Sequence, residues 1–177
     1  MKINIIPFGD SYERECLDLI KKIVTDGFID EGIDIKRDKK HLDEELLIQF
    51  TRLKEFSHHY FLAQKDNKVV GMIAYLQPCE AVKLAMKSLK IKSSSIIEIV
   101  AVYVHPDHQR KGIGSMLFKK MKGILHKNNI DYFAVSTGYK KGRAFWTKNL
   151  GEVSVLFPTY YSGHPCSAWI RKVGDII

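Results

Sequence analysis

Two glycines at the start of an expected helix carry the clearest chemical signal in the sequence. Gly112 and Gly114 follow the cationic pair Arg110 and Lys111, and Ser115 comes directly after them. The first N–H groups of a helix have no intrahelical partner and carry the positive end of the helix dipole, so they attract phosphate. Glycine lacks the Cβ that would keep a phosphate away from those groups. The segment therefore predicts a phosphate or pyrophosphate site.

Two common phosphate-binding motifs do not fit this segment. A P-loop needs the longer spacing Gly-x-x-x-x-Gly-Lys-Ser/Thr, and no such spacing is present. A dinucleotide fingerprint needs a third glycine in Gly-x-Gly-x-x-Gly, and Leu117 stands at that position. The pattern is therefore that of a different phosphate-binding family.

The elements that must position this segment follow from hydrophobic periodicity. The chain is expected to begin with a strand at 3–8. A helix is expected from Asp10, with Glu13 three residues later in capping-box position. Gly27 and Gly32 are expected to interrupt the chain after it.

A second helix and a hairpin are expected next. The helix spans roughly 39–56. Its predicted apolar stripe consists of Leu42, Leu46, Leu47, Phe50 and Leu53. Residues 59–78 read as two strands joined by the turn Asp66-Asn67. A short helix at 79–90 is expected in the next connection.

The rest of the chain alternates strands and helices around a buried central strand. The segment SIIEIVAVYV at 95–104 is β-branched and nearly continuous in apolar character, which predicts burial on both faces. The elements expected after it are a helix at 112–127, a strand at 130–137, a helix at 142–149, and strands at 152–157 and 167–173. This order predicts an α/β or α+β fold around one mixed sheet.

Length and composition limit the classes of protein to which this chain can belong. With 177 residues, 45% of them apolar, the chain is expected to form a single domain over 1–177. The net charge of +8 predicts attraction to polyanions, so nucleic acid, an anionic membrane surface and a phosphate-bearing cofactor stay open. The longest apolar run, at 96–104, is too short to span a bilayer. A cytoplasmic location is therefore expected.

Three cysteines are widely spaced along the chain. They are Cys16, Cys79 and Cys166, and no Cys-x-x-Cys occurs. An odd number at such spacing argues against a disulfide framework and against a zinc site, and no metal site is expected. Each cysteine is expected to be an ordinary buried or half-buried thiol, although a nucleophilic role stays open.

The segment QRKGIG at 109–114 resembles the Gln/Arg-x-x-Gly-x-Gly/Ala motif of the GCN5-related N-acetyltransferase (GNAT) family. The longer segment VYVHPDHQRKGIGSMLFKKM at 102–121 looks like that family's acetyl-CoA segment, and AFWTKNLGEV at 144–153 resembles a later helix. The resemblance implies a strongly bent mixed sheet with helices on both faces. It also implies a V-shaped split between the fourth and fifth strands that holds the cofactor.

The resemblance assigns cofactor contacts residue by residue. It implies that the backbone of Val102 to Val104 pairs with the pantetheine arm and that the N–H groups of 110–115 hold the pyrophosphate. The cofactor-binding residues implied in this way are Val102, Tyr103, Val104, Gln109, Arg110, Lys111, Gly112, Ile113, Gly114 and Ser115. The plain alternative for Gly112 and Gly114 is a loop-to-helix turn without a ligand.

The implied reaction is direct attack of an amine on the acetyl thioester. Because a free alkyl amine is mostly protonated at neutral pH, a base is needed, and a carboxylate is a common one. Glu98, the charged residue in the strand at 95–104, is the candidate catalytic base. A carboxylate there costs free energy unless it is paired, solvated or neutral. The alternative is that Glu98 faces outward or pairs with a Lys or Arg.

The thiolate that leaves coenzyme A also needs a proton. The family often uses a Tyr in the aromatic pair of the later helix, but here that pair is Phe145-Trp146, and Trp cannot be a general acid. Tyr139 is the candidate catalytic acid, with Tyr160, Tyr161 or water as substitutes.

The expected function is an acetyl-CoA-dependent N-acetyltransferase acting on a primary amine of a small molecule or peptide. The alternative is a non-catalytic acyl-CoA-binding module, perhaps a sensor. A nucleic-acid binder is a weaker third hypothesis, because the Lys residues are scattered and no helix-turn-helix or aromatic RNA motif is seen. No nucleic-acid or membrane partner is expected. A homodimer stays open, since no residue decides it.

Overall fold

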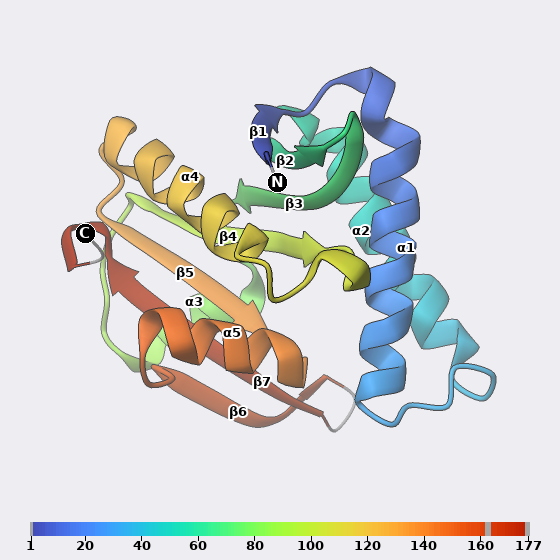
Figure 1. The fold of residues 1–177 in the computed structure, drawn as a ribbon. Coiled ribbons are helices and arrows are strands. Elements are labelled where there is room, and N and C mark those ends of the chain that lie inside the picture. Colours follow the sequence, from blue (N-terminus) through green and yellow to red (C-terminus); the bar gives the residue numbers. More distant parts are fainter. Residues whose placement is uncertain (1, 162–163, 176–177) are drawn as a thin grey trace. The chain divides into compact units, whose positions relative to one another are not determined.

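The structure, a computed structural model, describes residues 2–161 and 164–175 (Figure 1). The chain forms two compact units. The first consists of Met1–Ala74 and Ala101–Met121, and the second of Tyr75–Val100 and Lys122–Ile177. Each unit therefore combines two segments that are distant in the sequence. That residues 1–177 behave as one domain stays a prediction.

The first unit contains an antiparallel meander. Its strands are β1 (Asn4–Pro7), β2 (Tyr60–Lys65) and β3 (Lys68–Leu76). β2 pairs with both neighbours, and the register against β3 shifts between Ala63 and Gln64. Asp66 and Asn67 have φ of 50° and 62°, as a two-residue hairpin turn requires, so the predicted hairpin is confirmed.

Helix α1 (Glu13–Asp30) begins and ends differently from the sequence prediction. Asp10 to Tyr12 form a 3₁₀ turn, η1, and no side chain caps either η1 or α1, so the predicted capping box is wrong. Gly27 lies inside α1 and does not interrupt it. Gly32, with φ of 77°, follows the helix at a position where glycine avoids backbone strain.

Helix α2 (Lys39–Glu55) matches its predicted range, and a 3₁₀ turn, η2 (Ser57–His59), follows it. Its buried residues are Leu42, Gln49 and Leu53. The predicted stripe is wrong at Leu47, which is 65% exposed. Gln49 takes a buried place and donates to Glu45 at 2.8 Å.

The second unit contains four strands, one of which continues into the first unit. They are β4 (Ile96–Val104), β5 (Tyr132–Thr137), β6 (Val155–Tyr161) and β7 (His164–Lys172). β4 runs parallel to β5, with the paired positions Ile96 to Glu98 against Tyr132 to Ala134. β7 pairs antiparallel with β5 and β6. The strand order is β1-β2-β3-β4-β5-β7-β6, a mixed seven-stranded sheet.

Helices cover both faces of the strands in the second unit. Helix α3 (Glu80–Ser88) contacts β5 and β7, and its Val82 and Ala85 share a buried cluster with Ala134. Helix α5 (Lys140–Leu150) packs on the other face, where its Gly142 lies against Thr137. Ala134 and Thr137 are three residues apart on β5, so they point to opposite faces. This arrangement confirms the predicted fold class.

Helix α4 (Ile113–Lys127) begins directly after the glycine-containing loop, which a 3₁₀ turn, η3 (Pro106–His108), precedes. The buried side chains on α4 are Ile113, Leu117, Phe118, Met121 and Leu125. Met116, which is adjacent to Leu117 in the sequence, is 39% exposed. A last 3₁₀ turn, η4 (Val173–Asp175), follows β7. No described helix is long and apolar enough to cross a bilayer.

Candidate functional site

The loop before α4 has the conformation that its glycine-containing sequence predicts. Gly112 has φ of 82°, and Arg110 also lies in the left-handed region with φ of 57°. Apart from its two chain neighbours, no described residue has an atom within 4 Å of a Cβ built at Gly112, so the requirement for glycine there is conformational rather than steric. The side-chain amide of Gln109 donates to the carbonyl of Val104 at 3.0 Å and closes the loop onto the end of β4.

The N-terminus of α4 presents N–H groups that the helix itself does not use. The first intrahelical bond runs from the N–H of Met116 to the carbonyl of Gly112 at 3.0 Å. The N–H groups of Ile113, Gly114 and Ser115 precede it and have no partner four residues earlier in the helix. They lie at the positive end of the helix dipole, so this end of α4 can bind an anion.

Cationic groups surround this loop within the first unit. The pKa of His108 is lowered first by burial and then by the charges of Lys65, Lys111 and His105, against the opposing charge of Asp107. The ammonium of Lys111 donates to the carbonyl of Asp107 at 2.6 Å. A lowered pKa keeps His108 neutral at physiological pH, so His108 adds no positive charge.

Gly71 of β3 is a positioning residue that the sequence did not reveal. A Cβ at Gly71 would lie 2.9 Å from the carbonyl oxygen of Tyr103 and 3.3 Å from the side chains of Ile113 and Leu117. The absence of a side chain therefore lets β4 and the first turn of α4 pack closely on β3. The available signal was a glycine in the interior of a predicted strand, which often marks close backbone approach.

Ala101 gives β4 an irregularity directly before the predicted pantetheine-binding residues. Its φ is 52°, although it is neither glycine nor exposed. Such a residue costs free energy and is commonly found where function requires a bent or bulged strand. Val102, Tyr103 and Val104 follow it and are half-buried. No sequence pattern marks an alanine for this conformation.

Glu98 lies in the second unit and is buried, with 3% of its surface exposed. Its Oε1 accepts the hydroxyl hydrogen of Ser136 at 2.6 Å, and its Oε2 accepts the N–H of Cys79 at 2.8 Å. The Sγ of Cys79 lies 3.5 Å from Oε1 and 3.6 Å from the Ser136 hydroxyl. The carboxylate is therefore held by a hydroxyl and a main-chain N–H, and the alternative of an outward-facing Glu98 is wrong.

The charge of this carboxylate contributes to the pKa shifts of two further groups, Cys79 and Tyr160. Burial, and then the charge of Glu98, raise the pKa of the Cys79 thiol above its ordinary value. Burial also raises the pKa of Tyr160, and the nearby acidic groups Cys79, Cys166, Glu80 and Glu98 add to the shift. At neutral pH both groups therefore keep their protons, and both can donate them.

Tyr139, the predicted acid, stands at the start of α5. Its N–H donates to the hydroxyl of Thr137 at 3.2 Å, and its carbonyl accepts the N–H of Arg143 at 2.9 Å. Trp146, which replaces the tyrosine common in the family, is 4% exposed and packs edge-on against Phe145. Trp146 thus belongs to the core. The side chain of Tyr161 lies outside the described part of the chain.

The structure brings the predicted residues together in two groups. The residues predicted to bind the cofactor lie on the end of β4, the loop after it and the start of α4 in the first unit, whereas Glu98 and Tyr139 lie in the second unit. The two groups are linked along β4, where Glu98 precedes Val102 by four residues.

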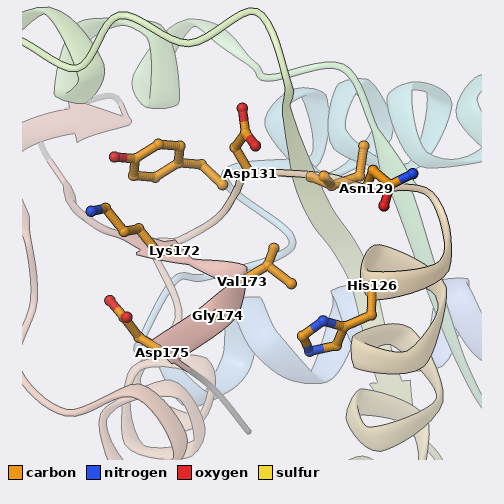
Figure 2. A pocket seen from close by; sticks show the side chains of 9 residues that line it. His126, Asn129, Asp131, Lys172, Val173, Gly174 and Asp175 are labelled. Atoms are coloured by element: carbon orange, nitrogen blue, oxygen red, sulfur yellow. The ribbon is translucent and has the colours of Figure 1, made fainter.

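A cavity of about 480 Å³ in the second unit contains none of the predicted site residues. Figure 2 shows its lining side chains: His126 from the end of α4, Asp131 before β5, and Lys172, Val173 and Asp175 from β7 and η4. It lies at the start of β5, whereas Ser136 and Thr137 lie at the end of that strand. The cavity is therefore not the candidate active site.

The comparisons with known proteins identify the family of the chain. The model of the acetyltransferase (GNAT) family matches residues 20–151. No curated protein matches the chain. Among solved structures, the chain is similar to an acetyltransferase of the GNAT family from Staphylococcus aureus Mu50, with 19% identity and a TM-score of 0.64, over 97% of this chain and 99% of that one.

Two archaeal structures are also similar. One is the PaiA N-acetyltransferase from Thermoplasma acidophilum in complex with coenzyme A, with 15% identity and a TM-score of 0.64, over 95% of this chain and 98% of that one. The other is Ard1 from Thermoplasma volcanium, with 14% identity and a TM-score of 0.68, over 97% and 98%. At these identities the likeness shows a shared fold.

Proposed function

Since this chain belongs to the acetyltransferase (GNAT) family, we propose that it transfers the acetyl group of acetyl-CoA to a primary amine by direct attack in a ternary complex. The chain is an acetyltransferase, and acetyl-CoA is its cosubstrate. The observation that carries the proposal is the glycine-containing loop, which leads into the N–H groups at the start of α4 that the helix itself does not use.

The cofactor's pyrophosphate is expected to bind at that loop. Its negative charge would face the N–H groups of 110–115, the helix dipole and the nearby cations. The main chain of Val102 to Val104 would pair with the pantetheine arm, after the irregular position Ala101. Fixing the cofactor at both places would hold its thioester in one orientation, and such positioning is a large source of rate acceleration.

Glu98 would be the general base. The amine nitrogen forms a bond to the acetyl carbon, the bond from that carbon to sulfur breaks, and the proton of the amine passes to Glu98, directly or through water. The burial of Glu98 and its hydrogen bonds from Ser136 and Cys79 support this role. The hydroxyl of Ser136 and the N–H of Cys79 hold the carboxylate in one orientation.

The thiolate that leaves would take a proton from Tyr139, and Tyr160 is the alternative donor. Tyr139 stands at the start of α5, the helix that carries the family's usual donor position. In favour of Tyr160, the charges of Cys79 and Glu98 reach it, which places it near the proposed base. The two assignments can be tested separately, because replacing the true proton donor with Phe should lower the maximal rate.

The acceptor is proposed only as a primary amine of a small molecule or peptide. The acidic residues between α1 and α2 do not single out a cationic acceptor. Asp34 accepts the N–H groups of Lys36 and Arg37, and Lys39 pairs with Asp43 on the same helix. These carboxylates stabilise local structure, which gives them a role without any ligand.

A thiol-release assay tests the proposal. The wild type and Glu98→Gln should be given acetyl-CoA and a panel of amines that includes peptides with free N-termini, lysine peptides, polyamines and aminoglycosides. We expect release of free coenzyme A with at least one amine, and a rate about 10²- to 10⁴-fold lower for Glu98→Gln. Tight coenzyme A binding without release for any amine would instead favour the acyl-CoA-binding module.

A further inference from the structure

We propose that Ser136 and Cys79 are positioning residues for Glu98. The hydroxyl of Ser136 and the main-chain N–H of Cys79 hold the carboxylate so that Oε2 is the oxygen that takes the proton. This inference rests on the proposed role of Glu98 as base. The hydroxyl of Ser136 and the thiol of Cys79 both lie at Oε1, at 2.6 Å and 3.5 Å. Oε2 accepts only the N–H of Cys79 among the hydrogen bonds described for it.

The count of lone pairs decides between the two oxygens. A carboxylate oxygen has two lone-pair directions. At Oε1 two donors lie within hydrogen-bond distance, the Ser136 hydroxyl and the Cys79 thiol, and together they can use both directions. At Oε2 one direction takes the Cys79 N–H, which leaves the other for the amine proton or for a bridging water.

The fold brings Glu98, Ser136 and Cys79 together on one face of the strands. Glu98 pairs with Ala134 across β4 and β5, and Ser136 is two residues further along β5, so the three side chains share a face. Helix α3 packs on that same face, where Val82 and Ala85 contact the cluster around Ala134. This packing sets Cys79, the residue just before α3, against the carboxylate.

Helix α3 adds a favourable field to this contact. It has nine residues, and Cys79 is its N-cap, with an extended backbone at φ −71° and ψ 174°. The positive end of its dipole therefore faces Glu98, and the Cys79 N–H is one of the groups that the helix leaves unused. Together with the Ser136 hydroxyl, these interactions offset the cost of burying a carboxylate.

Cys79 is a donor in this cluster rather than a nucleophile. Burial and the charge of Glu98 raise the pKa of its thiol, and a thiol is nucleophilic only as the thiolate. The other titratable groups that share this region are Glu80 at the start of α3, Tyr160 on β6 and Cys166 on β7. An acetyl-cysteine intermediate at Cys79 is therefore not part of the proposal.

The first test concerns Ser136. Ser136→Ala should lower kcat about 10- to 100-fold, move the acid limb of the pH–rate profile to higher pH, and leave the KM for acetyl-CoA unchanged. Ser136→Thr keeps a hydroxyl and should restore both kcat and the profile. Ser167→Ala is the matched control, because Ser167 is 1% exposed and its hydroxyl has no hydrogen-bond partner among the described residues.

The second test separates the thiol of Cys79 from its N–H. Cys79→Ala removes only the thiol and should reduce kcat by no more than a few-fold. Cys79→Pro also removes the N–H, and the native φ of −71° suits proline. We expect a further loss of about tenfold or more for Cys79→Pro relative to Cys79→Ala. Thermal unfolding of each variant shows whether the fold is retained.

A readout without catalysis distinguishes failure of this inference from failure of the proposed function. In the full chain labelled with ¹³C at the glutamate carboxyl carbons, the Glu98 resonance is the one that Glu98→Gln removes. Its chemical shift should change in Ser136→Ala, should return to the wild-type value in Ser136→Thr and should be unchanged in Ser167→Ala. An unmoved resonance and an unchanged pH profile in Ser136→Ala would overturn the positioning role. A moved resonance with full activity of Glu98→Gln would overturn the base role instead.

Discussion

Gly71 of β3 faces the carbonyl oxygen of Tyr103 on β4 so closely that a Cβ at Gly71 would lie 2.9 Å from that oxygen. The same Cβ would lie 3.3 Å from Ile113, the first residue of α4. One residue without a side chain thus sets the distances between β3, the end of β4 and the start of the helix proposed to hold the cofactor.

We expect Gly71→Ala to damage both stability and cofactor affinity. The added methyl meets a backbone oxygen that cannot move without shifting β4, and overpacking of this kind costs about 1–3 kcal/mol of unfolding free energy. Gly123→Ala is the control, because Gly123 lies within α4 with open space at its Cβ, and the change should stabilise by about 0.5–1 kcal/mol. Urea unfolding and calorimetric titration with coenzyme A measure the two effects. Equal behaviour of both variants would contradict the role of Gly71.

Gly112→Asp should abolish coenzyme A binding with little loss of fold. The new carboxylate would stand beside the N–H groups proposed to bind pyrophosphate, and like charges repel. The matched control is Gly32→Asp, because Gly32 has a similar φ of 77° and is also open at its Cβ, so the backbone cost is shared. Calorimetric titration should show loss of binding only for Gly112→Asp. Retained affinity would remove the loop from the cofactor site.

Tyr139→Phe should lower kcat, and Tyr160→Phe should leave it nearly unchanged, if Tyr139 protonates the leaving thiolate. Loss of a general acid reduces the rate by about 10²- to 10⁴-fold. Steady-state rates of both variants over a range of pH decide between the tyrosines. A large loss confined to Tyr160→Phe would transfer the role to Tyr160, whose pKa is raised first by burial and then by acidic neighbours such as Cys79.

Tyr60→Phe should retain or raise the stability at neutral pH. Tyr60 is 1% exposed, and within the described part of the chain its hydroxyl has no hydrogen-bond partner, so the hydroxyl costs free energy to bury. Tyr12→Phe is the control, since the Tyr12 hydroxyl accepts a hydrogen bond from Gln64 at 3.1 Å and its loss should destabilise by about 1 kcal/mol.

Tyr60→Phe should also change how the free energy of unfolding depends on pH in the alkaline range. Burial raises the pKa of Tyr60 to about 12, against the opposing charge of Arg52. Because the unfolded chain loses this proton near pH 10 and the folded chain keeps it, stability falls as pH rises from about 10 to 12. Urea midpoints should fall less steeply over that range in Tyr60→Phe. Parallel curves for the two proteins would contradict the burial of a protonated hydroxyl.

The order of elements was predictable because each segment carries its own periodicity. The hairpin around Asp66 and the buried strand at 95–104 are examples, since turn chemistry and apolar character are local properties. Helix boundaries were less predictable. Asp10 has the residue type and spacing of a cap, but the chain forms a 3₁₀ turn there, and α1 starts at Glu13. Leu47 is apolar yet exposed, because tertiary packing and not composition decides which face of α2 is covered.

The candidate site was predictable only where a local motif marks it. The phosphate-binding loop is contiguous, and its glycine at 112 has the left-handed φ that the pattern requires. Ser136 and Cys79 lie 38 and 19 residues from Glu98 in the sequence, and only the pairing of β4 with β5 and the packing of α3 bring them to its carboxylate. Contacts of this kind have no sequence signature in a single chain.

A crystal structure with coenzyme A tests the central claim most directly. The account predicts that the pyrophosphate oxygens lie within hydrogen-bond distance of the main-chain N–H groups of Ile113, Gly114 and Ser115 at the start of α4. A complex in which the pyrophosphate binds elsewhere, while these N–H groups face only solvent, would contradict it.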